Sequence, residues 1–246
     1  MMSAICDIAL CLIHLGVYIL PCVALLIPLK RHTAIPSFVF RKLLHIVAFT
    51  AVALVMTGAD KAGIRWWCVT AAWVCVAVGL YPVLMILEHF DWFSGFFVEK
   101  SKGEIKRSLI VYFLTVAVLS VADGLLRGGL MLSAVAVIMW GTGDAAAALI
   151  GIPFGKHSGI PHTDGKKSLE GTAAMFLVSA LCGTLMLMHH TSFAPELLLI
   201  TLPAAAVGAA VELWSPSEYD TVTVPCAIYI SELFASFVAL LIFMVE

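Results

Sequence analysis

Charged residues are scarce in this sequence. Only 12% of its 246 residues are Asp, Glu, Lys or Arg, whereas 62% are hydrophobic and the mean hydropathy is +1.05. About a quarter of the residues in a soluble globular domain are charged, so this composition excludes a soluble domain and a disordered chain. It is typical of a polytopic membrane protein. The net charge of −2 indicates no particular partner, and no nucleic-acid partner is expected.

Two further absences narrow the class. None of the seven cysteines forms a CxxC pair, and nearly all of them lie in apolar runs. We interpret them as small buried hydrophobic residues rather than as a disulfide framework or a zinc site. The first residues contain no basic segment and no clear cleavage motif. We therefore expect a retained first span rather than a signal peptide.

Eight apolar runs account for most of the chain. A spanning helix needs about 20 apolar residues, so eight of them leave no room for a separate soluble domain. The runs lie at 4–28, 43–58, 66–87, 108–122, 129–150, 171–188, 196–212 and 222–245. We predict an all-α polytopic integral membrane protein with about eight transmembrane helices, in a single transmembrane domain over residues 1–246. Because the second, fourth and seventh runs are short, seven spans plus a re-entrant segment is the alternative.

The basic residues predict the orientation of these spans. The odd-numbered loops hold all but three of the 14 Lys and Arg residues, and the exceptions are Lys61, Arg65 and Arg127. Cytoplasmic loops of membrane proteins are enriched in Lys and Arg. We therefore expect the odd-numbered loops in the cytoplasm and both termini on the opposite side. The expected location is a bacterial inner membrane or a eukaryotic endomembrane.

A basic cluster opens the second span. Arg41 and His45 are four residues apart, so they share one face of a helix. A guanidinium at Arg41 can clamp a phosphate through two hydrogen bonds, and the ammonium of Lys42 adds a point charge. The alternative is an anchor in which the basic side chains extend to the bilayer surface. His45 fits an anchor less well because it lies inside the apolar run.

An acid lies at the apolar end of the fifth span. Asp144 follows Gly141 and Gly143 and precedes an alanine run, and an ionised carboxylate in such surroundings is costly without a cation or donor. The pattern suits a carboxylate that holds Mg²⁺ beside a polyphosphate, with glycine amides near the phosphates. The alternative is close helix packing through small residues, with Asp144 capping a broken helix.

A glycine-bounded basic loop leads into the sixth span. It contains Lys166, Lys167, Ser168 and Glu170. The loop looks like a Walker A motif, but its spacing is wrong and no strand precedes it, so we reject that interpretation. The amides at the start of the following helix can bind an anion. The alternative is a cytoplasmic anchor in which Ser168 caps the helix.

Further acids lie near the last two spans. Glu212 and Asp220 flank the seventh loop, and they either complete a metal site with Asp144 or are ordinary loop residues. Glu232 lies near the centre of the last span, where an acid is a functional candidate or a neutral, hydrogen-bonded group. The stretch from Glu99 to Arg107 mixes both signs of charge, which is typical of a solvated face.

Taken together, these motifs resemble the CTP-dependent lipid kinase family, which includes dolichol kinase, phytol kinase and the CTP-dependent diacylglycerol kinase. The resemblance extends from about Arg41 to Pro225, and its specific core is Gly143 to Gly171. The matching residues are Asp144, Gly151, Gly155, Lys167, Ser168 and Glu170 in the core, and Arg41, Lys42 and His45 in the N-terminal motif. One departure is Asp220-Thr221, where relatives commonly have Asp-Asn.

The resemblance implies transfer of the γ-phosphate of CTP to the hydroxyl of a lipid alcohol, either an isoprenoid alcohol or diacylglycerol. It implies Mg²⁺ or another divalent cation as cofactor, and partners that are the nucleotide, the lipid alcohol and membrane lipids. The expected catalytic residues are Asp144, Lys167, Glu170 and His45. The expected phosphate-binding residues are Arg41, Lys42, Gly151, Gly155, Lys156, Lys166, Ser168 and Arg107. The expected metal ligands are Asp144, Glu212 and Asp220.

Two other activities compete with the kinase. Phosphatidate cytidylyltransferases share the core, but they usually end in a signature of the form KD, PGHGG and DRxD, which this chain lacks. The RKxxH motif at Arg41 belongs to the kinases. A transporter would need polar residues along a path through the membrane, whereas here they gather on one face.

Overall fold

The computed structural model describes residues 2–90, 103–160, 163, 167–190, 196–216 and 219–243. Within these residues the chain is helical apart from connecting segments and an isolated β-bridge between Ser158 and Ser168. The helices are α1 (Met2–His32), α2 (Ser37–Lys61), α3 (Trp66–Leu87), α5 (Glu104–Arg127), α6 (Met131–Phe154), α7 (Leu169–His190), α8 (Glu196–Trp214) and α9 (Asp220–Phe243).

Eight described helices are long and apolar enough to cross a membrane, so the predicted polytopic all-α fold is confirmed. The runs that looked short in the sequence belong to full-length helices, because α2 has 25 residues, α5 has 24 and α8 has 19. Each of these helices continues into polar residues at its ends. The described chain therefore has eight candidate spans rather than seven and a re-entrant segment.

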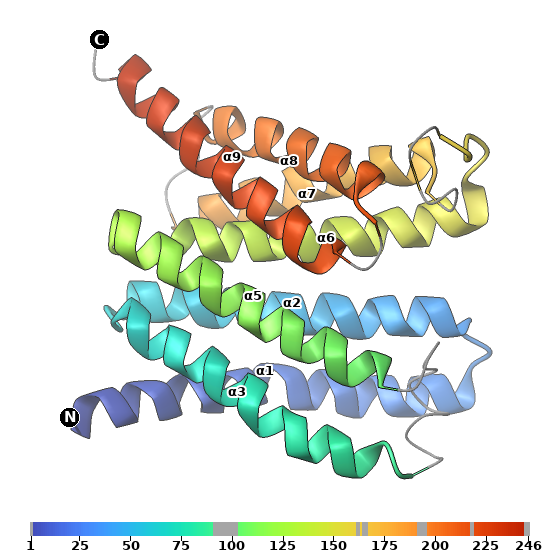
Figure 1. Ribbon diagram of the computed structural model, residues 1–246, viewed down its shortest axis with the longest axis horizontal. Coiled ribbons are helices and arrows are strands. Elements are labelled where there is room, and N and C mark those ends of the chain that lie inside the picture. The colour runs from blue at the N-terminus through green and yellow to red at the C-terminus, as the bar shows by residue number, and fades with distance from the viewer. Residues whose placement is uncertain are drawn as a thin grey trace.

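Helix α6 forms the centre of the bundle, and it packs against α7, α2 and α9. Figure 1 shows α1, α2, α3 and α5 in the lower part of the molecule and α6 to α9 in the upper part. The two parts meet mainly where α2 lies along α6. Small residues permit this close packing, since a Cβ at Gly143 would lie 2.1 Å from the Ser179 hydroxyl of α7.

Two carboxylates cap the start of α6. Gly128 adopts a left-handed conformation with a φ of 74° and ends α5, so the chain turns sharply into α6. Asp60 Oδ1 accepts a hydrogen bond of 2.9 Å from the Leu130 amide, and Asp123 Oδ2 accepts one of 2.9 Å from the Ser133 amide. Amides in the first turn of a helix have no partner within it, and the helix dipole favours negative charge there.

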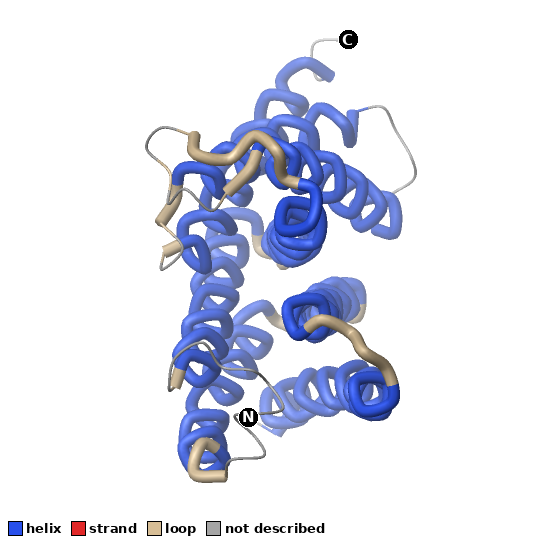
Figure 2. Tube along the Cα trace, turned by 90° about the vertical axis from the view of Figure 1, so that its right-hand side faces the viewer, coloured by secondary structure: helices blue, strands red, loops and turns tan. Residues whose placement is uncertain are grey.

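The two ends of the bundle differ. The start of α1 and the end of α9 lie at one end, on the left of Figure 1, and the described residues 155–160, 167–168 and 215–216 lie at the other end. Figure 2 looks onto this second end, which we call the loop end. The side of the membrane that each end of the bundle faces remains a prediction, and so does the location of the two termini.

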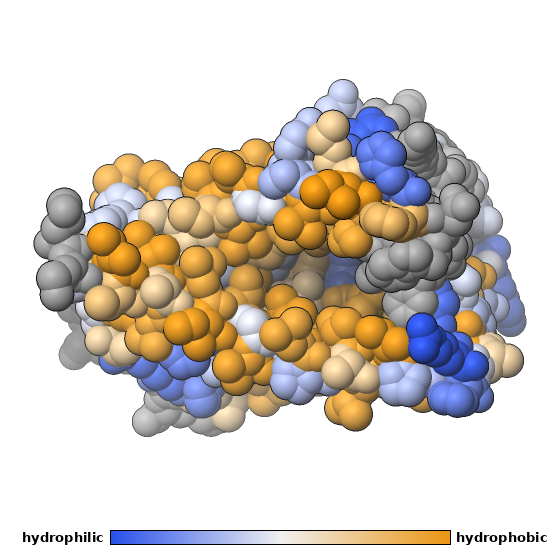
Figure 3. All heavy atoms as spheres, turned by 90° about the horizontal axis from the view of Figure 1, so that it is seen from below, coloured by the Kyte–Doolittle hydropathy of each residue, from blue (hydrophilic) through white to orange (hydrophobic). Residues whose placement is uncertain are grey.

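The outer surface suits a bilayer. Large hydrophobic side chains are exposed along several helices, for example Leu20 and Leu25 of α1 and Val78 of α3. Figure 3 shows a face on which hydrophobic residues cover most of the middle and hydrophilic residues gather toward the ends. Exposed apolar surface of this extent is expected where lipid tails surround the helices.

Candidate active site

An ion pair between α2 and α6 lies at the centre of the candidate site. Lys42 Nζ is 2.6 Å from Asp144 Oδ2, and His45 Nε2 is 3.2 Å from the same oxygen. The side chains of Lys42 and Asp144 are only 22% and 24% exposed. A charge-assisted hydrogen bond in such surroundings is shorter and stronger than a neutral one. The ammonium of Lys42 is therefore the cation that the carboxylate of Asp144 needs at the apolar end of a helix.

Aromatic side chains pack against His45. Its ring stacks on Phe49, one turn further along α2, with ring centroids 4.0 Å apart. Phe49 in turn packs against Tyr112 of α5 at 4.4 Å and against Trp140 of α6 at 4.5 Å. The fit requires Gly141, where a Cβ would lie 2.2 Å from the Phe49 ring. These rings belong to the apolar core, so His45 lies where the charged site meets that core.

A second ion pair joins the loop before α7 to the end of α8. Lys167 Nζ is 3.2 Å from Glu212 Oε1, and both side chains are 12% exposed. The same ammonium donates to the main-chain carbonyls of Glu212 and Ser215. A cation at a helix C-terminus is stabilised by the unpaired carbonyls and by the helix dipole. Lys167 is thereby held over the C-terminus of α8.

The two ion pairs and Asp220 form one charged group. Asp220, the first residue of α9, interacts electrostatically with Asp144, Lys167 and Lys42. Asp144 also interacts with Lys167. Thr221 donates a hydrogen bond of 3.3 Å to Asp220. Three carboxylates, two lysines and a histidine from α2, α6, α8, α9 and the loop before α7 therefore share one region.

The predicted metal ligands are part of this group. Among the described residues, no three His, Cys, Asp or Glu side chains are close enough together to hold a metal ion on their own. Mg²⁺ is usually held by one or two carboxylates, with substrate phosphates and water completing the octahedron. The oxygen donors of Asp144, Glu212 and Asp220 fit a Mg²⁺ that arrives with a polyphosphate. The metal site stays a prediction.

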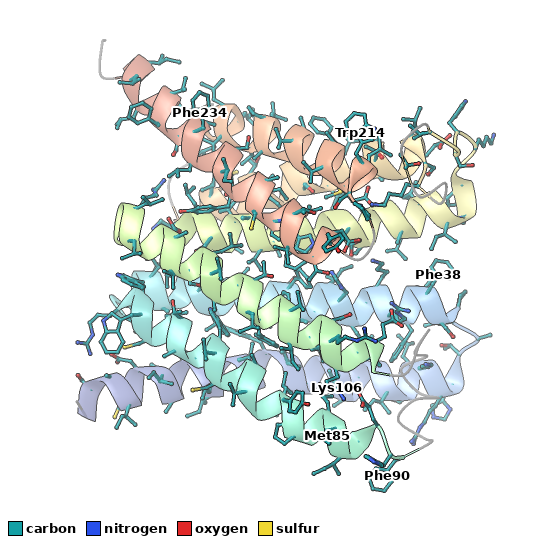
Figure 4. All side chains as sticks on the ribbon, viewed as in Figure 1. Phe38, Met85, Phe90, Lys106, Trp214 and Phe234 are labelled. Atoms are coloured by element: carbon teal, nitrogen blue, oxygen red, sulfur yellow. The ribbon has the colours of Figure 1, made fainter. Side chains whose placement is uncertain are left out.

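Arg41 has a partner that the sequence analysis missed. Its Nη2 is 3.2 Å from Glu104 Oε1 at the start of α5. In the same turn of α5, Lys106 Nζ is 2.8 Å from Oε2 of Glu88, the residue just past the end of α3. Figure 4 labels Lys106 near the start of α5. The described part of the stretch read as a solvated face thus ties α5 to α2 and α3. The signal in the sequence that could have revealed these contacts is that Glu104 and Lys106 lie just before an apolar run.

The glycines of the motif core bring α6 and α7 together. A Cβ at Gly155 would lie 2.4 Å from the Gly151 carbonyl oxygen and 2.6 Å from the Ser168 hydroxyl, and one at Gly171 would lie 2.9 Å from the Ala147 carbonyl oxygen. Ser168 Oγ accepts a hydrogen bond of 3.2 Å from the Gly171 amide, so it caps α7 as the alternative interpretation predicted. A phosphate-binding role for these residues stays a prediction.

The remaining predicted residues lie elsewhere. Glu170 Oε1 is 2.6 Å from His157 Nδ1, and the Glu170 carboxylate also accepts from the His157 amide at 3.3 Å. Glu170 therefore holds the segment after α6. The side chains of Lys156 and Arg107 are exposed. Lys166 lies outside the described residues.

Glu232 occupies the interior of α9. Its side chain is fully buried, and neither carboxylate oxygen has a hydrogen-bond partner in the described part of the chain. The hydrogen bond to a neighbouring helix that we expected is therefore not observed among these residues. Glu232 does not belong to the charged group around Asp144.

The fold and the site together define a polytopic membrane protein with a charged cluster at one end of an apolar bundle. The chain is similar to a curated phytol kinase from Synechocystis sp., with 27% identity over 209 residues that cover 80% of this chain and 79% of the relative. This similarity confirms the predicted resemblance to the CTP-dependent lipid kinase family. No family model matches the chain, and no solved structure matches it.

Proposed function

We propose that this protein is a lipid alcohol kinase that transfers the γ-phosphate of CTP to the hydroxyl of an isoprenoid-type alcohol at the cytoplasmic face of the membrane. The observation that carries the proposal is the group formed by Lys42, His45 and Asp144 at the loop end. The similarity to a phytol kinase supports the class of reaction and of acceptor. The choice of CTP and the cytoplasmic orientation rest on the family resemblance and on the loop charges.

The cations of the site suit a nucleotide triphosphate. Phosphoryl transfer depends mainly on in-line positioning and on neutralising the charge of the phosphates. Lys42 and Lys167 bring two ammonium groups into one region, and Arg41 adds a guanidinium that can grip a phosphate through two parallel hydrogen bonds. The carboxylates of Asp144, Glu104 and Glu212 hold these cations in place.

Asp144 and Asp220 would hold a Mg²⁺ ion bound to the nucleotide, with Glu212 as a further candidate. Such an ion supplies neutralising charge at the phosphates. Lys42 and Lys167 then orient the remaining phosphate oxygens, and the apolar surroundings strengthen these contacts relative to water.

His45 is our choice for the group that handles the acceptor hydroxyl. It lies where the charged group meets the aromatic rings, so a lipid hydroxyl that enters laterally between the helices reaches it before the phosphates. Its imidazole accepts the hydroxyl proton while the oxygen bonds to the γ-phosphorus and the bond to the β-phosphate oxygen breaks. The products are the lipid phosphate and CDP. Glu170, the other candidate base, is engaged by His157.

The test uses purified protein in detergent or nanodiscs with CTP labelled on the γ-phosphate and a panel of lipid alcohols. We expect the label in the lipid fraction with an isoprenoid alcohol and Mg²⁺, and none with Asp144→Asn. Transfer of an α-label instead would establish a cytidylyltransferase and overturn the kinase. ATP in parallel tests the choice of nucleotide, and diacylglycerol tests the class of acceptor.

A further inference from the structure

A second polar region lies at the end of the bundle that carries the termini, opposite the candidate active site. It surrounds a cavity of about 380 Å³ lined by residues of α2, α5, α6, α7, α8 and α9. Its polar lining residues are Asp60, Arg127, His190 and Ser236, and its apolar wall includes Leu197 and Ile200. A lipid kinase whose chemistry occurs at the loop end has no use for these charges, which are expensive inside a membrane protein.

The cavity carries opposite charges on different walls. Arg127 Nε is 3.7 Å from Asp123 Oδ1, and its Nη1 donates to the Ser236 hydroxyl at 3.4 Å. Asp60 Oδ2 is 3.7 Å from His190 Nε2, while its Oδ1 caps α6. Within the described part of the chain, Arg127 and Asp60 form no ion pair with each other. Arg127 faces Asp123 and also interacts electrostatically with the buried Glu232 of α9. The charge of Asp60 faces His190 and whatever fills the cavity.

Two buried polar atoms beside the cavity also lack partners. His190 Nδ1 and Asp123 Oδ1 have no hydrogen-bond partner among the described residues, and Asp123 is completely buried. A buried polar atom without a hydrogen bond costs free energy, so such atoms usually mark the place of a ligand or water. When Nε2 of His190 carries its proton toward Asp60, Nδ1 is an acceptor that faces no donor.

We propose that this cavity binds the headgroup of a membrane phospholipid that carries both a phosphate and a primary ammonium group. The guanidinium of Arg127, which has five N–H donors, and the Ser236 hydroxyl hold the phosphate. Asp60 Oδ2 accepts a hydrogen bond from the ammonium. The apolar wall at Leu197 and Ile200 holds the start of the acyl chains. The location between spanning helices favours a lipid over a soluble molecule.

The test is native mass spectrometry of the purified protein with phosphatidylethanolamine, phosphatidylcholine and phosphatidylglycerol of identical acyl chains. We expect phosphatidylethanolamine to bind about tenfold more tightly than either of the others, the difference of one charged hydrogen bond. Phosphatidylcholine has no N–H donor for Asp60, and phosphatidylglycerol has no cation. Asp60→Asn keeps an oxygen for the Leu130 amide, removes the charge and should abolish the preference over phosphatidylcholine.

Two tryptophan variants on α8 form a matched pair. Ile200→Trp fills the cavity without touching a charged group, whereas Leu198→Trp places the same ring on an exposed position of the same helix that does not line the cavity. We expect the first to lose the lipid preference and the second to keep it. Phosphatidylethanolamine should raise the unfolding temperature of the wild type and of Leu198→Trp only.

Absence of a preference in the wild type would overturn the proposal, as would an unchanged preference in Ile200→Trp or Asp60→Asn. Soluble phosphoethanolamine that binds as tightly as the lipid would overturn the assignment to a membrane lipid. None of these variants changes a residue of the candidate active site, so the outcome is independent of the proposed kinase activity.

Discussion

Lys42 of α2 and Asp144 of α6 form an ion pair of 2.6 Å between residues 102 positions apart in the chain. The pair joins the two parts of the bundle where they meet, and it brings together the two motifs that most strongly indicated a kinase. Breaking a partly buried pair leaves an uncompensated charge, so each partner constrains what the other can be replaced by. The first two predictions test the two partners separately.

Replacing Asp144 by Asn should abolish turnover while the protein still folds and inserts. The amide cannot compensate Lys42 and is a poor ligand for Mg²⁺, so we expect kcat to fall by about 100-fold or more. The measurement is the initial rate of label transfer, with helix content by circular dichroism as the check on folding. Asp7→Asn is the control, because Asp7 pairs with Arg65 on the other end of the bundle. Wild-type turnover in Asp144→Asn would remove the centre of the mechanism.

Lys42→Ala should weaken nucleotide binding more than it slows the chemical step. Loss of one charge-assisted contact to a phosphate predicts a rise in the KM for CTP of about tenfold or more. The control is Lys30→Ala, since Lys30 lies at the end of α1 over the Phe40 ring, outside the charged group. The readout is a CTP titration at saturating lipid alcohol. A KM equal to that of the wild type would refute the phosphate role of Lys42.

His45→Ala should slow the chemical step more than it weakens nucleotide binding. If His45 accepts the proton of the acceptor hydroxyl, kcat falls by about 100-fold or more, while the KM for CTP changes little. Added imidazole should restore part of kcat, because the deletion leaves space above Phe49. Rescue distinguishes proton transfer from simple support of the site. A loss that imidazole does not reverse, together with a raised KM, would assign His45 a structural role.

Much of this arrangement was predictable, and the reason is physical. Spanning helices are easy to recognise in a sequence because a bilayer requires about 20 apolar residues in a row. The eight apolar runs therefore correspond to the eight described helices that could cross a membrane. The loop charges placed Lys42 and Asp144 at the same end of the bundle. Their direct contact was not predictable, because it depends on how α2 and α6 are rotated about their axes. The same limit hid the partners of Arg41 and Glu170.

The exact helix ends and the second polar region could not be predicted from the sequence. The second run was expected at 43–58, but α2 extends from Ser37 to Lys61, because helices continue past the apolar part of a membrane into polar residues. Asp60 and Arg127 fell in expected loops, of which we used only the Lys and Arg residues to count charges, whereas the structure places them in the last turns of α2 and α5. Their convergence on one cavity follows from the packing of six helices, which no local pattern encodes.

Glu170→Gln and His157→Gln should cause similar, moderate losses. Each variant breaks the same 2.6 Å contact, so the double variant should lose little more than either single variant. The measurement is a double-mutant cycle on kcat/KM. If Glu170 were the base for the acceptor hydroxyl, Glu170→Gln alone would abolish turnover and His157→Gln would cost little. That outcome would move the proton transfer from His45 to Glu170.

Gly155→Ala separates the packing role of the core glycines from a phosphate-binding role. The added Cβ would lie 2.4 Å from the Gly151 carbonyl oxygen, so α6 and Ser168 must move apart. We expect a loss of about 1–3 kcal/mol in the free energy of unfolding, measured by thermal unfolding in detergent. Gly79→Ala in α3 is the matched control, because nothing lies within 4 Å of its Cβ and alanine favours a helix. If close packing is the whole role of Gly155, the folded fraction of the variant keeps the KM for CTP of the wild type. A raised KM with unchanged stability would instead place the Gly155 backbone at the phosphates.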